Sequence, residues 1–163
     1  MERIPIYSVV AWSGTGKTTF LEKLIPELRN NGLRVAVIKH DAHNFEIDKE
    51  GKDTWRLTRA GADMTLINSD TKAAVMENRP VRIERLVSFV HDVDVILTEG
   101  YKHGDWPRIL IYRKATGHAP ALDPETCFAV VTDEHFDCAA PQFGLDEAAD
   151  VAALICKDMG RSV

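Results

Sequence analysis

Short apolar runs alternate along the chain with polar or glycine-containing stretches. Apolar runs that are rich in β-branched side chains and bounded by turn residues are typical of buried strands. We expect strands at residues 4–10, 33–38, 64–68, 73–77, 93–98, 108–113 and 127–131. A strand–helix–strand order requires a parallel sheet. We therefore predict a three-layer α/β fold, with a mostly parallel sheet flanked by helices and an antiparallel hairpin formed by 64–68 and 73–77.

Helical patterns lie between and after these runs. The first helix ends at Asn31-Gly32, and Pro26 inside it should kink it or loosen one turn. A short helix is expected at residues 52–60, and another begins at Pro80. Its apolar stripe, expected in the core, is Ile83, Leu86, Val87 and Val90. The last helix, which Gly160 ends, should bury one face made of Leu145, Ala148, Ala149, Ala152, Ile155, Cys156 and Met159.

A loop of small residues, Ala11 to Thr19, joins the first strand to the first helix. A strand, a glycine-containing loop, Lys-Thr and a helix form the context of a phosphate-binding P-loop, where backbone N–H groups converge on an anion. Ala11 replaces the first glycine of the full pattern, so an ordinary turn before a helix is the alternative. We predict that Lys17 is catalytic and lies between the terminal phosphates. The phosphate-binding set is Ser13, Gly14, Thr15, Gly16, Lys17, Thr18 and Thr19.

The strand at 93–98 ends in Glu99-Gly100. A carboxylate at the end of a hydrophobic strand can hold Mg²⁺ opposite the P-loop hydroxyl, here Thr18. We predict Thr18 and Glu99 as metal ligands and expect the Gly100 amide to approach a terminal phosphate. A Glu-Gly turn without function is the alternative.

The polar loop at 39–51 leaves the carboxyl end of the second strand, where open α/β sheets build their sites. Asp41 is our first candidate there for facing the metal or activating a nucleophile, and Asp48 is the second. A solvated loop is an equally good interpretation of either residue. The His40-x-x-His43 spacing is a weak indication of zinc, because two histidines without further ligands rarely make a site.

A later strand is followed by Thr132-Asp133, and a carboxylate there could accept hydrogen bonds from guanine. A turn-forming aspartate is the alternative, since the Asn-Lys-x-Asp motif of G proteins is absent. Lys102 could contact phosphates of a nucleotide. Arg113 and Lys114 are better explained as solvated charges at a strand end.

The composition fits one nucleotide-binding domain spanning residues 1–163. Of 163 residues, 45% are hydrophobic, and the net charge of −5 gives no reason to expect a nucleic-acid partner. No apolar run is long enough to span a membrane, and the first residues lack a signal-peptide pattern. The cysteines (Cys127, Cys138 and Cys156) form no Cys-x-x-Cys. We expect reduced thiols and a cytoplasmic protein.

Several spaced motifs together resemble one known family. They are 11–19, Leu24-Ile25-Pro26, Ile38-Lys39-His40, Asp48-Lys49-x-Gly51-Lys52-Asp53, Ala60-Gly61-Ala62 and Glu99-Gly100-Tyr101-Lys102-His103. These look like the MobB family, the molybdopterin-guanine dinucleotide biosynthesis adaptor proteins of bacteria. The likeness is closest from Val9 to Ala62 and around Glu99.

The resemblance implies a dimeric P-loop protein that binds GTP with Mg²⁺ and hydrolyses it slowly at best. It also implies a partner, the guanylyltransferase MobA, which joins GMP to molybdopterin, and it makes molybdopterin itself a candidate ligand. Carried over by motif, residues 14–19 bind phosphates, Thr18 and Glu99 face Mg²⁺, and the Asp41, Asp48 and Lys52-Asp53 segment flanks the terminal phosphate or the partner's substrate.

Two other functions fit the same P-loop. A small-molecule kinase would need an acceptor pocket and a lid that excludes water, for which residues 102–114 are the candidate. An interaction module with a vestigial nucleotide site would keep its role without Lys17.

Overall fold

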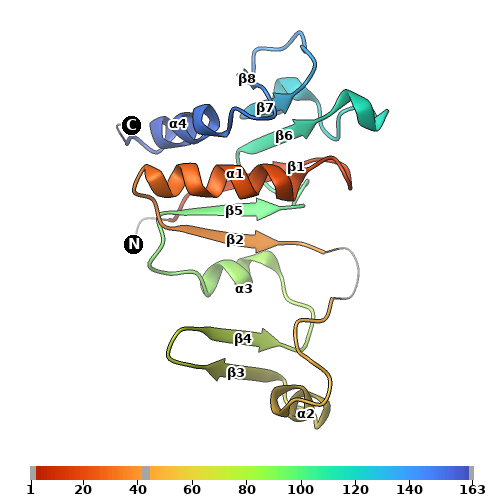
Figure 1. Cartoon of the computed structure of the whole chain (residues 1–163), viewed down its shortest axis with the longest axis vertical. Coiled ribbons are helices and arrows are strands. Elements are labelled where there is room, and N and C mark those ends of the chain that lie inside the picture. The colour runs from red at the N-terminus through yellow and green to blue at the C-terminus, as the bar shows by residue number, and fades with distance from the viewer. Residues whose placement is uncertain (1–2, 42–44, 162–163) are drawn as a thin grey trace. The chain divides into compact units, whose positions relative to one another are not determined.

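The computed structural model describes residues 3–41 and 45–161, so His43 of the proposed zinc pair lies outside the described residues. Contacts divide the chain into two compact units (Figure 1). The first comprises Met1–His40 and Asp92–Val163, and the second comprises Asp41–His91. The prediction of one domain over residues 1–163 stays a prediction.

A six-stranded sheet forms the centre of the first unit, in the order β2-β5-β1-β6-β7-β8 (Figure 1). All of its paired strands are parallel. The strands are β1 (Ile6–Val10), β2 (Val35–Lys39), β5 (Val95–Glu99), β6 (Arg108–Tyr112), β7 (Ala129–Thr132) and β8 (Gln142–Phe143). The register pairs Glu99 of β5 with Val9 on one side and Lys39 on the other. The carboxyl ends of these three strands therefore meet at one edge of the sheet.

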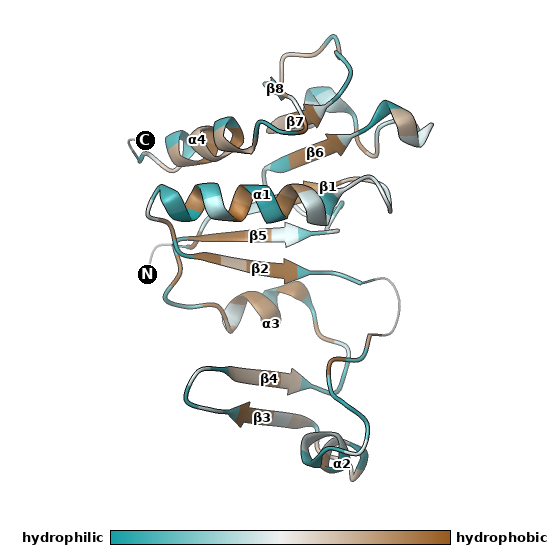
Figure 2. Cartoon of the chain, in the orientation of Figure 1, coloured by the Kyte–Doolittle hydropathy of each residue, from teal (hydrophilic) through white to brown (hydrophobic). Residues whose placement is uncertain are grey.

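Two helices, α1 (Lys17–Asn30) and α4 (Ala148–Asp158), pack against each other and against one face of this sheet. Figure 2 shows brown, hydrophobic colour along most of β5 and β6, and alternating brown and teal turns along α1. The first helix ends as expected, because Gly32 adopts a φ of 78° and lets the Leu33 N–H donate to the Leu28 carbonyl at 3.1 Å. Pro26 lies within α1, which runs unbroken from Lys17 to Asn30.

The other face of β6 and β7 is covered by irregular segments of the chain rather than by an α-helix. Leu110, Cys127 and Val130 form a second cluster there, against which Phe136 and Leu122 pack. Two 3₁₀ turns follow β6, η1 (Lys114–Thr116) and η2 (Pro124–Thr126).

The second unit contains α2 (Asp53–Arg59), β3 (Met64–Asn68), β4 (Ala73–Glu77) and α3 (Ile83–Ser88). The strands β3 and β4 pair antiparallel, which confirms the predicted hairpin. Together with the parallel sheet and its helices, the hairpin confirms the predicted fold class.

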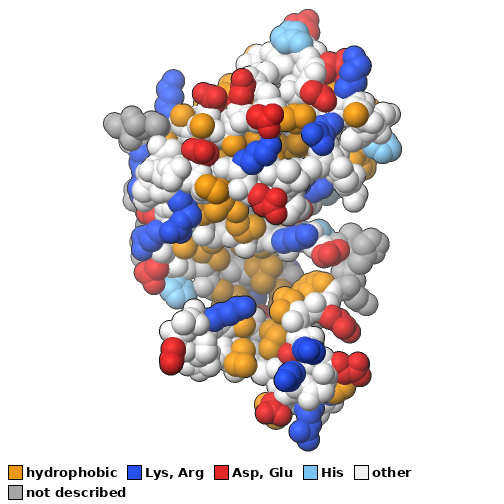
Figure 3. Space-filling view, in the orientation of Figure 1, with side chains coloured by type: hydrophobic (Ala, Val, Ile, Leu, Met, Phe, Trp, Pro, Cys, Tyr) orange, Lys and Arg blue, Asp and Glu red, His pale blue; other side chains and the backbone are white. Residues whose placement is uncertain are grey.

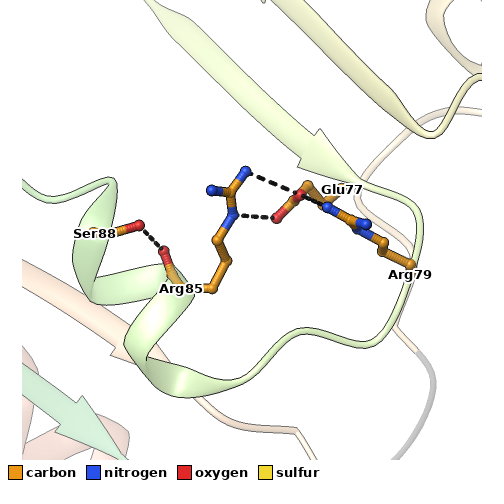
Figure 4. A network of polar contacts seen from close by, with 4 residues as sticks. All are labelled: Glu77, Arg79, Arg85 and Ser88. Atoms are coloured by element: carbon orange, nitrogen blue, oxygen red, sulfur yellow. Dashed lines mark hydrogen bonds and ion pairs between the residues drawn. The ribbon is translucent and has the colours of Figure 1, made fainter.

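In the second unit, the carboxylate of Glu77 is bonded to two arginines (Figure 4). Arg85 of α3 donates to both oxygens of Glu77 at the end of β4, at 3.2 and 3.3 Å, and Arg79 donates at 2.8 Å. The Glu77 side chain is only 5% exposed, so the arginines take the place of water around its charge. They hold the pKa of Glu77 below its usual value, with the Arg85 hydrogen bond the main cause.

Several details differ from the sequence prediction. The helix expected to start at Pro80 starts at Ile83, and no residue of its apolar stripe is fully buried. In α4 the expected core residue Ala149 is exposed, whereas Val151 is fully buried. A lid over 102–114 is wrong for its second half, because 108–112 is the strand β6 inside the sheet.

Side chains of both charges are interspersed over the face of the protein seen in Figure 3. The parts of the chain that the structure describes contain no helix that is both long and apolar enough to cross a membrane.

Candidate functional site

The loop between β1 and α1 contains two glycines in the conformation that a phosphate-binding loop needs. Gly14 and Gly16 have φ values of 75° and 104°, in the left-handed region that side chains with a Cβ avoid. Gly16 is the N-cap of α1 and has no side chain that could cap the helix. The first N–H groups of the helix can therefore donate to another partner. A concavity of unpaired N–H groups at the positive end of a helix favours a phosphate.

One side chain in this loop is buried without a hydrogen-bond partner. Thr15 is 3% exposed, and its hydroxyl contacts no acceptor or donor among the described residues. A buried hydroxyl usually finds a partner, because leaving it unpaired costs about 1–3 kcal/mol. The cost is explained if the loop is shaped for an oxygen-rich ligand that supplies the missing bond.

Lys17, the first residue of α1, lies back over its own loop. Its ammonium donates to the carbonyls of Ala11 at 3.2 Å and Trp12 at 3.0 Å. Partial burial lowers its pKa, and the charges of Lys102 and Lys39 lower it further, while Glu99 opposes them. Lys102 and Lys39 therefore repel the Lys17 ammonium, and an anion bound beside it would relieve that repulsion.

The hydroxyl of Thr18 donates to a Glu99 carboxylate oxygen at 3.0 Å. Residues 81 positions apart are thus joined at the point where β5 ends against the first turn of α1. Two of the residues predicted to face a metal therefore lie side by side, and Glu99 is 8% exposed. A hydroxyl and one carboxylate suit Mg²⁺ in a phosphate site, where the ion takes most of its ligands from phosphates and water. No cage of three or more His, Cys, Asp or Glu side chains exists among the described residues.

Gly100 follows Glu99 with a φ of 98°. Its N–H donates to the Val9 carbonyl at 3.3 Å, so the amide expected to approach a phosphate is bonded within the sheet in this structure. A Cβ at this position would lie 3.1 Å from the His40 carbonyl oxygen. The glycine therefore allows the ends of β2 and β5 to come close together.

Lys102 lies where a phosphate contact is feasible. Its ammonium is 3.7 Å from the centre of the Trp12 ring, and it makes no ion pair among the described residues. Lys114, by contrast, pairs with Glu134 at 2.8 Å, which fits the interpretation as a strand-end charge.

Thr132 and Asp133 line a pocket of about 330 Å³ at the carboxyl end of β7, with Glu134, His135, Gln142 and Phe143. One Asp133 oxygen accepts the Lys114 N–H at 2.8 Å. The Thr132 hydroxyl bonds the backbone of Glu134 at 2.9 Å. Both residues thus shape a turn, and the pocket that they line lies at the same edge of the parallel sheet as the P-loop.

Asp41 and Asp48 belong to the second unit. Asp48 accepts the Lys49 N–H at 2.9 Å and the Thr54 hydroxyl at 3.0 Å. Its other carboxylate oxygen is buried without a hydrogen-bond partner among the described residues. Asp48 therefore orders the turn before α2 and keeps one oxygen for another group.

The structure adds Lys39 and Trp12 to the site. Lys39 ends β2 beside Glu99, and this neighbourhood depends on strand register, which the sequence does not reveal. Trp12 could have been noticed from sequence alone, because a large aromatic residue is unusual in a loop whose purpose is backbone access.

The parallel sheet, the glycine loop before α1 and the Thr18–Glu99 pair define the class of the protein, which has the P-loop NTPase fold. The family model for "Molybdopterin guanine dinucleotide synthesis protein B", MobB, matches residues 6–133, and the chain belongs to this family.

Proteins of known name and structure agree with this assignment. The Molybdopterin-guanine dinucleotide biosynthesis adapter protein of Escherichia coli (strain K12) is 38% identical over 162 residues, which cover 96% of this chain and 87% of that protein. The protein of the same name from Haemophilus influenzae is 41% identical over 136 residues, covering 80% and 76%. The crystal structure of Bacillus subtilis MobB superposes with a TM-score of 0.72 at 26% identity and covers 97% of this chain and 98% of that one.

Proposed function

We propose that the protein is a GTP-binding adaptor that assists the guanylyltransferase MobA, which attaches GMP to molybdopterin in molybdenum cofactor biosynthesis. It would act as a homodimer and hydrolyse GTP slowly or not at all. The adapter role is supported by the names of the relatives. The nucleotide role depends mainly on one observation, the contact of the Thr18 hydroxyl with the Glu99 carboxylate at 3.0 Å under a glycine loop.

The residues of the loop divide the work of holding a triphosphate. The N–H groups of residues 14–19 would cradle the phosphates, and the Thr15 hydroxyl would donate to one of their oxygens. Lys17 would exchange its two carbonyl partners for terminal phosphate oxygens, and these bonds would be stronger because donor and acceptor would both be charged. Thr18 and Glu99 would hold Mg²⁺, whose charge would offset that of the phosphates. Asp41 and Asp48 are retained as candidates for a further carboxylate.

Slow hydrolysis is expected because the sequence shows no recognisable arginine finger and no identified residue that positions water. Such groups contribute about 10³–10⁵ in rate. The site is therefore expected to bind GTP more readily than it cleaves it.

The base would lie in the pocket at the end of β7, where Thr132 and Asp133 are found. The Asp133 oxygen that does not accept the Lys114 N–H could accept from the N1–H and N2–H₂ groups of guanine, which adenine lacks in that arrangement. This assignment predicts that GTP binds more tightly than ATP.

Titration calorimetry with Mg²⁺-GTP and Mg²⁺-ATP tests the proposal. We expect GTP to bind, and EDTA or Thr18→Ala to weaken it at least tenfold. Thr71→Ala in the β3–β4 turn is the control and should bind as the wild type does. A thermal shift should follow, since ligand at a hundredfold over Kd stabilises by about 2.7 kcal/mol. Equal binding of both nucleotides would contradict guanine selection, and binding of neither would contradict the function.

An assay of GMP transfer by MobA, with and without the protein, tests the adaptor role. The wild type should stimulate MobA, and Lys17→Ala should not. If Lys17→Ala stimulates MobA fully, the protein is an interaction module and its nucleotide site is dispensable. Transfer of phosphate to a small acceptor without MobA would support a kinase instead.

A further inference from the structure

Trp12 connects three segments around the P-loop. Its backbone carbonyl accepts from Lys17 at 3.0 Å. Its indole N–H donates to the Ala119 carbonyl at 2.8 Å, which fixes the ring against the segment after β6. The Lys102 ammonium lies 3.7 Å from the ring centre, and Trp12 as a whole residue is 45% exposed. An aromatic side chain held at its N–H and carrying a cation on its face is an ordered support for that cation.

The nature of this support matters for what Lys102 can do. A carboxylate partner would neutralise the ammonium and compete with an incoming phosphate. An indole face attracts a cation without neutralising it. The ammonium has three N–H donors, and contact with one ring face leaves donors directed elsewhere. Lys102 is therefore oriented and still fully able to pair with an anion.

The charges near Lys102 show where that anion would be. Lys17 and Lys102 both contact Trp12, because Lys17 donates to its carbonyl at 3.0 Å and the Lys102 ammonium lies 3.7 Å from the centre of its ring. Lys17 is the residue that reaches the terminal phosphates in a P-loop. A free lysine side chain has several rotatable bonds. If the side chain is held in place before the ligand binds, part of the entropy cost of binding is removed.

We propose that Trp12 is a positioning residue, which holds the Lys102 ammonium beside the P-loop so that it contacts the terminal phosphate of a bound nucleoside triphosphate. This inference rests on the proposed nucleotide site and assigns to it a determinant of triphosphate over diphosphate binding. Trp12 itself makes no contact with the nucleotide and acts on it only by positioning Lys102.

A double-mutant cycle on the full-length protein tests the proposal, with Kd values for Mg²⁺-GTP and Mg²⁺-GDP from calorimetry. Trp12→Leu and Lys102→Gln should each lower the affinity for GTP about three- to tenfold, the range expected for one cation–π-supported contact. The affinity for GDP should fall less than twofold in either variant. Trp12→Leu/Lys102→Gln together should be no weaker than Lys102→Gln alone, because Trp12 acts through Lys102.

Lys102→Arg and Trp12→Phe give readouts that a merely structural role would not move. Lys102→Arg keeps a cation that stacks on the indole, so GTP affinity should return to within about twofold of the wild type. Trp12→Phe keeps a ring but loses the donor to Ala119. Its affinity for GTP should therefore lie between that of the wild type and that of Trp12→Leu. It also replaces Trp12→Leu should the latter fail to fold.

Trp55→Leu is the matched control. Trp55 also has a cation on its ring, with Arg59 at 5.3 Å, but it belongs to α2 in the second unit. Its replacement should leave the ratio of GTP to GDP affinity unchanged. If wild-type protein binds no GTP, the proposed function fails. If it binds GTP while Trp12→Leu keeps the wild-type ratio, or the two substitutions weaken GTP independently, only the role of Trp12 is overturned.

Discussion

The phenol of Tyr7 donates to the Asp158 carboxylate at 2.5 Å, so that the first strand is bonded to the end of the last helix. Tyr7 is 1% exposed and also contacts the Phe128 ring, with the ring centroids 5.3 Å apart. Burial is the main cause that raises the pKa of Tyr7, and the bond to Asp158 raises it further, so the phenol stays protonated and a donor.

Tyr7→Phe should therefore destabilise the protein by about 1–2 kcal/mol, since a hydrogen bond to a charged group is lost while the ring remains. Urea denaturation measures the change. Tyr112→Phe is the control, because its hydroxyl bonds Glu134 at 3.3 Å and should cost less. Equal stability of Tyr7→Phe and wild type would show that this bond contributes nothing.

Asp94, just before β5, is held by two arginines. The Arg34 side chain donates at 3.1 Å and its backbone N–H at 2.8 Å, and Arg161 donates at 3.1 Å. These bonds, led by the Arg34 side chain, lower the pKa of Asp94 from 3.8 to about 2. A depressed pKa stabilises the fold above the unfolded value and loses this effect as the pH falls through the folded value.

Asp94→Asn should thus cost about 1 kcal/mol at pH 7, a figure reduced for the solvent around Arg34, and almost nothing at pH 2. Urea midpoints between pH 7 and pH 2 measure the convergence of the two proteins. Asp146→Asn, whose partner Lys23 is bonded on the surface, should show a smaller effect. A constant difference over the whole pH range would contradict the charge-based account.

Glu77 is the residue whose loss should affect the second unit alone. Replacing it by Gln removes the charge that holds Arg85 and Arg79 (Figure 4). We expect faster amide hydrogen exchange in β3 and β4, and unchanged exchange in β1. Glu84→Gln removes only an exposed pair with Arg82 and should leave both regions as they are. Equal acceleration of β1 would mean that the network supports the whole chain.

Thr15 offers a test that separates stability from binding. Thr15→Val keeps the shape and removes the unpaired buried hydroxyl, so the free protein should be as stable or up to about 1 kcal/mol more stable. GTP affinity should fall several-fold. Thr65→Val is the control, since its buried hydroxyl bonds Thr58 at 3.1 Å and its removal should destabilise. Unchanged GTP affinity in Thr15→Val would show that the hydroxyl does not face the ligand.

Local patterns were reliable where a segment's own chemistry determines its conformation. The hairpin strands match the expected ranges at both ends, and Gly32 closes α1 as predicted. Prediction failed where the local signal was weak or burial depended on neighbours. The two residues of β8 are too few for a pattern, and Ala149 is exposed because the register of α4 against the sheet turns Val151 inward instead.

The sequence by itself determined most of the strands and helices and the glycine loop, because periodicity and glycine conformations are properties of short stretches. It also predicted Thr18 and Glu99 together as candidate metal ligands. Only the tertiary structure brought these two within 3.0 Å, set Lys39 beside Glu99 and put Lys102 over Trp12. Such contacts depend on strand order and register, which arise from packing the whole sheet and are written in no single segment.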